Sequence, residues 1–141
     1  MDLLRALFFS YLYETLIIYD KGNYKNRNGL SKLSVREMDI YMKFKNLISQ
    51  KIHYHRDLEF YASELCVTPK HLIKLIKNIT GQTPKKLIDS SLLSILKYKL
   101  EYTALPVSSL AEELNFSSTP AFCRFFKMQT GMTPQQYRNS H

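Results

Sequence analysis

Apolar residues recur at every third or fourth position over residues 2–19, which is the spacing of one face of a helix. Phe9, Leu16 and Ile17 widen this apolar surface beyond a single stripe. The pattern predicts a helix that is buried on more than one side. Polar residues fill 21–32, where Gly22 favours a helix end, so this stretch is predicted to be a loop.

A second helix is predicted from Ser34 to about His53. Ser34 and Glu37 have the spacing of a capping box, in which each side chain accepts a hydrogen bond from the other residue's backbone N–H. The apolar positions of this helix are expected at Val35, Met38, Tyr41, Met42, Leu47 and Ile48, with Phe44 on its flank.

The sequence repeats itself once after Asp57, because residues 58–84 resemble residues 107–134. Ala62 corresponds to Ala111 before an internal turn, and Leu72 corresponds to Phe122 after it, so the second copy has one extra residue at the turn. Both copies end in Thr-Gly-x-Thr-Pro. Two copies at this spacing indicate a duplicated supersecondary unit, since a solenoid needs about three or more repeats.

Each copy carries the signals of a helix, a tight turn and a second helix. Thr68 with Pro69 predicts the start of the second helix in the first copy, because a hydroxyl caps the helix and proline suits its first position. Ser117 or Ser118, followed by Pro120, does the same in the second copy. Both second helices are predicted to end at a left-handed glycine, Gly81 or Gly131. A small alanine in each first helix permits the close crossing of a helix-turn-helix.

These signals predict an all-α protein with two helix-turn-helix subdomains, a long linker helix between them and two N-terminal helices. The helix-turn-helix units are expected at about 57–81 and about 107–131, and the linker helix at 84–102, ended by Leu105-Pro106. A further helix is expected from Thr133-Pro134. The predicted domains are an N-terminal helical segment, 1–55, and a tandem domain, 56–141. The buried side of the linker is expected to carry Leu87, Ile88, Leu92, Ile95, Leu96 and Leu100.

The formal net charge of +8 favours an anionic partner, and the positions of the charges sharpen this inference. Residues 66–86 hold five lysines and no acidic residue, and the chain after Glu113 holds three basic residues and no acidic one. Both stretches include a predicted second helix of a copy. The segregation of positive charge therefore favours nucleic acid as the partner.

The sequence carries few signals of catalysis, metal binding or membrane targeting. No nucleophile–base pair, glycine-rich phosphate loop or paired carboxylates appear, so an enzyme is not expected, nor is a cofactor. His53 and His55 have a metal-ligand spacing without accompanying ligands, so no metal is expected. Cys66 and Cys123 fit free thiols in a reducing cytoplasm. Arg5 and the lack of a cleavage site argue against a signal peptide, and no membrane span is expected.

The second copy resembles the AraC/XylS family of bacterial transcription regulators. Its residues 110–138 contain a turn like Ala-x-x-x-Gly-Phe, then Phe-x-Arg-x-Phe-Lys, then Gly-x-Thr-Pro-x-x-Tyr-Arg, and the first copy is similar to the family's other unit. The resemblance implies two helix-turn-helix units, each inserting its second helix into a major groove of double-stranded DNA. It implies that 1–55 corresponds to the linker and dimerisation helices, without the family's sensor barrel. A homodimer through these helices and RNA polymerase are the further partners it allows.

The resemblance also places the DNA contacts. Base contacts carried over to the first copy fall on Lys70, His71, Ile73 and Lys74, and those carried over to the second fall on Thr119, Ala121, Cys123 and Arg124. Lys77 and Lys127 match each other in the repeat, and the lack of acidic residues around them adds them to the expected DNA contacts. Phosphate contacts are expected at Lys85, Lys86 and Arg138, near helix starts. Arg124 suits a bidentate contact with guanine.

This chain departs from the family in two places. Asn115 stands where the family usually has glycine, and asparagine is among the side chains that best tolerate positive φ. Ile73, Ala121 and Cys123 offer no strong hydrogen bond to a base, though they suit a thymine methyl. The alternatives to a DNA-binding regulator are a protein-interaction module and a membrane-surface helix, both of which would use residues 2–19.

Overall fold

The computed structural model describes Leu7 and residues 34–141. The helix predicted over 2–19, apart from helical Leu7, and the loop predicted over 21–32 lie outside the described residues. The contacts divide the chain into two compact units, Met1–Val35 and Arg36–His141, and the second unit holds the tandem fold. Its helices are α2 (Val35–Lys51), α3 (Leu58–Glu64), α4 (Pro69–Thr80), α5 (Pro84–Tyr102), α6 (Val107–Glu113), α7 (Thr119–Thr130) and α8 (Pro134–Asn139).

Helix α2 forms where it was predicted, and Ile48 is buried as expected, but the centre of its buried face differs from the prediction. Phe44, expected on the flank, is fully buried between Ile40 and Ile48, whereas Val35 is 85% exposed and Met42 also faces solvent. Apolar residues lie on more than one side of this helix, so helical spacing alone allowed two choices of inner face. The stripe spaced by four residues, which has a large aromatic ring at its centre, is the buried one.

Each helix-turn-helix unit begins its second helix at the predicted cap. The Thr68 hydroxyl accepts a hydrogen bond from the His71 N–H at 3.1 Å, and the Ser118 hydroxyl accepts one from Ala121 at 3.2 Å. Gly81 and Gly131 end the two helices with φ of 74° and 78°. The sequence prediction of two matched helix pairs, α3 with α4 and α6 with α7, is confirmed.

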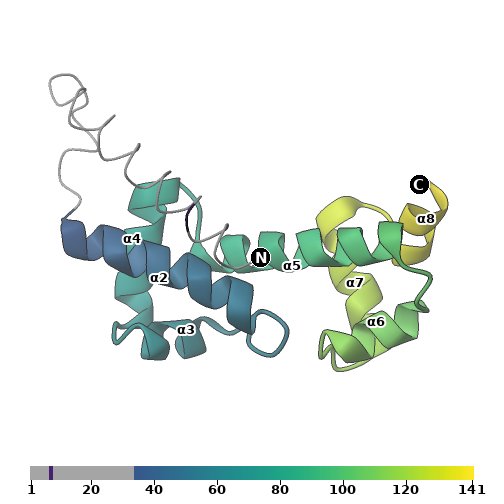
Figure 1. Ribbon diagram of the computed structural model, residues 1–141, viewed down its shortest axis with the longest axis horizontal. Coiled ribbons are helices and arrows are strands. Elements are labelled where there is room, and N and C mark those ends of the chain that lie inside the picture. Colours follow the sequence, from purple (N-terminus) through teal and green to yellow (C-terminus); the bar gives the residue numbers. More distant parts are fainter. Residues whose placement is uncertain (1–6, 8–33) are drawn as a thin grey trace, which may run out of the picture. The chain divides into compact units, whose positions relative to one another are not determined.

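Helix α5 joins the two pairs, as predicted. Ile88, Leu92, Leu96 and Leu100 form its buried stripe, while Leu87 and Ile95 are partly buried beside it. Helix α4 contacts α5, and α8 contacts both α5 and α7. Figure 1 shows α3 and α4 near one end of α5, and α6, α7 and α8 near the other.

The two helix pairs have cores of different composition. The first pair buries Leu72, Leu75 and Ile76 of α4, and Tyr61 of α3 meets Phe44 edge-to-face. The second pair buries aromatic rings, and Phe126 lies between Phe122 and Tyr137 with centroid separations of 6.2 and 5.3 Å. Phe122 and Phe126 are both fully buried in this core.

None of the helices in the described part of the chain is both long enough and apolar enough to cross a membrane.

Candidate nucleic-acid interface

The outer face of α4 is cationic. Its inner face carries the three buried apolar residues named above, and the spacing of the helix turns the remaining positions outward. Ile73, with 38% of its surface exposed, is the one apolar side chain among the predicted contacts on this helix. All five residues predicted to contact DNA in the first copy are exposed: Lys70, His71, Ile73, Lys74 and Lys77.

The outer face of α7 is less uniformly charged. Arg124 and Lys127 are exposed, while Thr119, Ala121 and Cys123 are half-buried. Met128 is 84% exposed on the same helix and was not predicted as a site residue. The repeat could have revealed it, because Met128 corresponds to exposed Asn78 of α4 and follows Arg124 at the i+4 spacing of one helix face.

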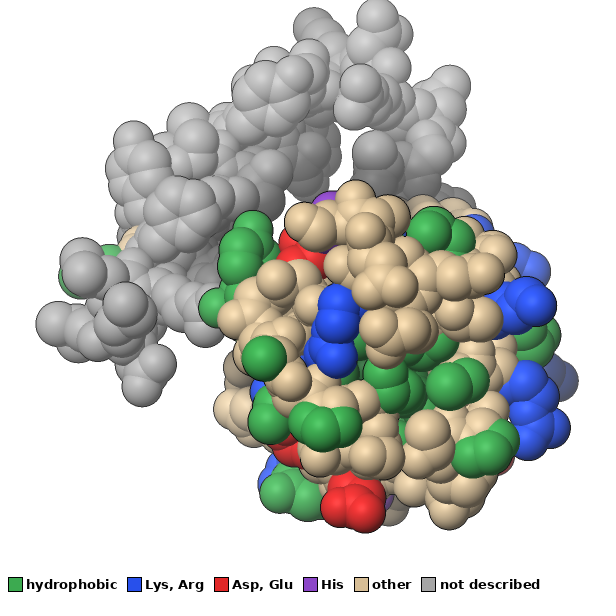
Figure 2. Space-filling view, turned by 90° about the vertical axis from the view of Figure 1, so that its right-hand side faces the viewer, with side chains coloured by type: hydrophobic (Ala, Val, Ile, Leu, Met, Phe, Trp, Pro, Cys, Tyr) green, Lys and Arg blue, Asp and Glu red, His purple; other side chains and the backbone are tan. Residues whose placement is uncertain are grey.

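The cations of these helices have no counter-charge in the described part of the chain. Neither α4 nor α7 contains an acidic residue, and no ion pair within residues 34–141 involves their lysines or Arg124. The ion pairs that do form lie elsewhere, for example Lys43 with Asp39 at 2.8 Å. Figure 2 shows several Lys and Arg side chains along one edge of the face at the α6–α8 end, and others in the middle and on the opposite side, nearer the acidic side chains. Unpaired, solvated cations are available to an anionic ligand.

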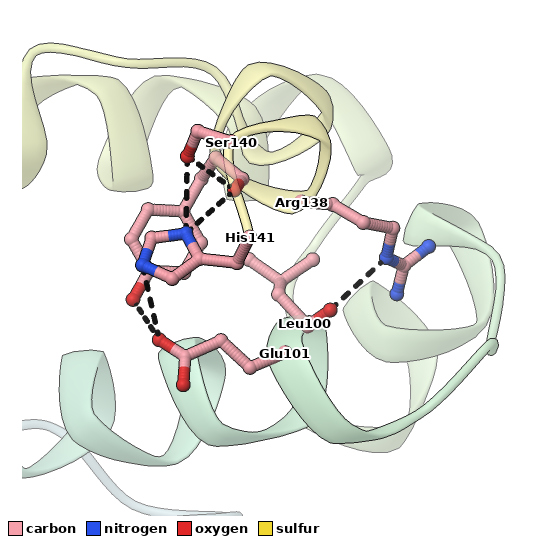
Figure 3. A network of polar contacts seen from close by, with 6 residues as sticks. Leu100, Glu101, Arg138, Ser140 and His141 are labelled. Atoms are coloured by element: carbon pink, nitrogen blue, oxygen red, sulfur yellow. Dashed lines mark hydrogen bonds and ion pairs between the residues drawn. The ribbon is translucent and has the colours of Figure 1, made fainter.

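The three predicted phosphate contacts differ in their surroundings. Lys86 is exposed and makes no ion pair with another described residue. Lys85 pairs with Asp89 one turn later at 2.8 Å. Arg138 is half-buried, and its Nε donates a hydrogen bond to the Leu100 carbonyl at 3.3 Å, as Figure 3 shows. Phosphate contacts by these three residues stay predictions.

A polar network holds the C-terminus on α5. The Tyr137 hydroxyl donates a hydrogen bond to the Glu101 carboxylate, and the His141 ring lies 3.8 Å from the same carboxylate (Figure 3). This hydrogen bond and burial raise the pKa of Tyr137 to about 12. Since α8 packs on both α5 and α7, the network stabilises the placement of α7.

The tight turns of both units use a left-handed residue other than glycine. Asn115 has φ of 53°, so the prediction that asparagine supports this turn is confirmed. Cys66, at the matching place in the first unit, has φ of 55°, which was not predicted because cysteine is not a turn-forming residue. Backbone hydrogen bonds close both turns alike, from Val67 N to Ala62 O at 3.0 Å and from Phe116 N to Ala111 O at 2.9 Å.

Two matched helix pairs on one connecting helix, each with an exposed cationic second helix, define a tandem helix-turn-helix protein. Residues 61–140 match the model of a family described as a helix-turn-helix domain. The chain belongs to this family, which is the AraC-type family indicated by the sequence motifs.

Comparisons with individual proteins agree with this family membership. The chain is similar to the Right origin-binding protein of Escherichia coli (strain K12), with 36% identity over 83 residues, 59% of this chain and 29% of that protein. The C-terminal domain of AraT, a response regulator from Geobacillus stearothermophilus, superposes with a TM-score of 0.64 and 27% identity, covering 79% of this chain and 89% of that one.

A further solved structure shares the fold. It is the DNA-binding domain of AdpA, a global transcriptional factor, in complex with a target DNA, with a TM-score of 0.62 and 20% identity over 76% of this chain and 93% of that one. The chain thus covers 89% and 93% of these two solved structures, but it spans less than a third of the length of the curated relative above.

Proposed function

We propose that this chain is the sequence-specific, double-stranded DNA-binding part of a transcription regulator and places α4 and α7 in successive major grooves. Those grooves lie about 34 Å apart on one face of the duplex. The observation that carries the proposal is the pair of matched second helices, whose outward cations have no partner within the described residues. Family membership and the DNA-bound fold of AdpA support it.

Affinity and specificity come from different residues in this proposal. Lys70, Lys74, Lys77 and Lys127 neutralise phosphates and release counterions, which supplies sequence-independent affinity. Arg124 reads a guanine through its two-pronged guanidinium. Ile73 and Cys123 lie at matching positions of the repeat and offer apolar contacts to thymine methyl groups.

The proposal also includes the location of the regulator and its protein partners. The regulator acts in the bacterial cytoplasm, dimerises through its N-terminal helices and contacts RNA polymerase when it activates transcription. Binding and regulation require no enzymatic step of the chain itself.

Selection of bound sequences from a random duplex library tests the proposal directly. We expect two conserved half-sites separated by about one helical turn. Titration of the selected duplex at increasing salt should then give a log–log slope of about −0.9 per neutralised phosphate. Recovery of unselected sequences would overturn specific recognition, and lack of binding at low salt would overturn the DNA-binding role altogether.

A further inference from the structure

The segment between α2 and α3, residues 52–57, is held firmly on the first helix-turn-helix unit. Ile52 is fully buried in the core. The Tyr61 hydroxyl of α3 donates a hydrogen bond to the His55 carbonyl at 2.7 Å, and the His55 ring stacks on Phe60 with centroids 3.7 Å apart. Asp57 caps α3 by accepting a hydrogen bond from the Phe60 N–H. The segment therefore moves with the first unit.

The same segment contacts the turn of the second unit. The Asn115 side-chain amide donates a hydrogen bond to the His53 carbonyl at 2.8 Å. The Arg56 guanidinium lies 4.1 Å from the centre of the Phe116 ring. Burial lowers the pKa of Arg56, while the charge of Asp89 on α5 opposes this effect. Arginine nevertheless stays protonated, so this is a cation–π contact sheltered from solvent.

The contact extends toward α7, the second helix of the second unit. Phe116 lies against two rings of α7, with centroids 5.1 Å from Phe122 and 5.8 Å from Phe125. A ring fixed on one side by Arg56 and on the other by α7 couples the orientation of that helix to residues 52–57. The contact thus runs from the first unit to the element proposed to read DNA.

Among residues 34–141, the first unit has no such contact at its own turn. Cys66 takes the place of Asn115, and no hydrogen bond of its side chain forms within residues 34–141. Val67 takes the place of Phe116. Because the backbone hydrogen bonds of the two turns are alike, closing the turn does not require the Asn115 amide. The amide is therefore available for another task.

We infer that Arg56 and Asn115 are positioning residues that fix the separation and rotation of the two helix-turn-helix units. Both units pack on α5, and a second contact between them, away from that helix, further restricts the bending and twisting of one unit against the other. On the proposed function, on which this consequence rests, the chain then accepts only one spacing between its two half-sites.

A distance measurement tests the inference without DNA. Spin labels are placed at Asn78→Cys and Met128→Cys, which are exposed and matching positions, in a chain with Cys66→Ser and Cys123→Ser. We expect a single narrow distribution of label distances, which broadens in Asn115→Gly and in Arg56→Lys. Lysine keeps the charge but loses the planar group that stacks on Phe116. Glycine at position 66 is the matched control, since it makes the same kind of change at the turn without the contact.

Thermal melting followed by circular dichroism establishes that each variant is folded before its distances are interpreted. A distribution that stays equally narrow in both Asn115→Gly and Arg56→Lys overturns the inference. Broadening in both variants and not in the control supports the inference. If the chain then fails to bind DNA in the separate titrations, the proposed function is wrong while the inference about the contact still holds.

Spacing selectivity provides the functional readout. One base pair inserted between the half-sites displaces one of them by about 3.4 Å and rotates it by about 34°. A fixed geometry raises the effective concentration of the second unit at its half-site only when the spacing is right. The parent chain should therefore bind the duplex with the extra base pair at least about 10-fold more weakly than the original duplex. Both variants should lose affinity for the original spacing and show a preference of only about 2-fold, while binding to an isolated half-site stays unchanged. Retention of the full preference in both variants overturns this consequence.

Discussion

The two helix-turn-helix units have the same backbone fold. They differ in the side chains that form the core, in the residue at the tight turn and in the side chains that face outward. The first unit packs aliphatic residues behind α4, and the second packs phenylalanines behind α7. The first turns at Cys66 and the second at Asn115, with nearly equal φ. What the copies retain is the hydroxyl cap of the second helix, the terminal glycine and the small alanine, so the motif depends on these, whereas its interior requires only apolar volume.

The largest difference expected between the units lies in their cores. Phe126→Ala removes a fully buried ring and should cost about 3–5 kcal/mol of unfolding free energy. The matching change in the first unit, Ile76→Ala, removes fewer atoms and should cost less within a range of about 2–5 kcal/mol. Urea denaturation followed by circular dichroism measures both. Equal losses would mean that the aromatic core relaxes around the cavity.

The next difference lies between the matched cations Arg124 and Lys74. Arg124→Ala should weaken binding to the selected duplex by about 1–3 kcal/mol and relax the preference at one base pair. Lys74→Ala should weaken binding about equally for all sequences and reduce the salt slope by about 1. Band-shift titrations on the selected duplex and its single-base variants distinguish them. Identical behaviour of the two variants would remove the distinction between base reading and phosphate contact.

A smaller difference separates the two tyrosines whose pKa is raised, Tyr61 and Tyr137. Burial raises the pKa of Tyr61 to about 12, whereas the hydrogen bond to Glu101 is the main cause for Tyr137. A phenol whose pKa is higher in the folded state stabilises fully below pH 10, and this stability is lost as the pH rises from 10 to 12. Tyr137→Phe should cost about 1 kcal/mol at neutral pH and make the alkaline loss less steep.

Glu101→Gln serves as the control for this pH dependence. It removes the carboxylate that raises the pKa of Tyr137 and leaves the buried Tyr61 unaffected. Urea midpoints measured from pH 8 to 12 should therefore show flattening in Glu101→Gln, though less than in Tyr137→Phe, because burial still raises the pKa of Tyr137. Full retention of the alkaline slope in both variants would assign all of it to Tyr61 or to other groups.

The smallest effect compares the two turns. Positive φ costs a side-chain residue about 1–2 kcal/mol, and glycine loses about 0.5–1 kcal/mol in backbone entropy, so Cys66→Gly should stabilise by about 0.5 kcal/mol. Asn115→Gly relieves less strain and removes the hydrogen bond to His53, so it should destabilise by about 0.5 kcal/mol. Opposite signs in thermal or urea unfolding are the expected result. The same sign would mean that the contact with His53 contributes little stability.

Most of the fold could be predicted because its signals are local. Hydroxyl caps, prolines and terminal glycines lie next to the boundaries that they set, and α5 begins and ends where the pattern placed it. The inner face of α2 could not be predicted, because apolar residues on two sides leave the choice to packing against Tyr61. The repeat fixed which side of α4 and α7 faces outward, but exposed Met128 was overlooked since it belongs to no family motif.

The contact between the two units was beyond sequence reasoning. Arg56 precedes the repeat and Phe116 follows its turn, so nothing in local spacing joins them. Asn115 was recognised only as a tolerated substitute for glycine, because its amide finds a partner far away in the chain. Long-range partners of this kind depend on the relative placement of whole helices, which local patterns do not determine.

The open surroundings of Gly131 have a consequence for chemical synthesis. Its φ is +78°, and a Cβ built there would meet no atom within 4 Å, so only handedness excludes a side chain. A D-amino acid has the opposite handedness and favours this backbone conformation. Since Cys123 supplies a ligation thiol, residues 123–141 can be joined as a synthetic peptide carrying D-alanine at 131. The semisynthetic protein should gain about 0.4–1 kcal/mol by restricting its unfolded chain.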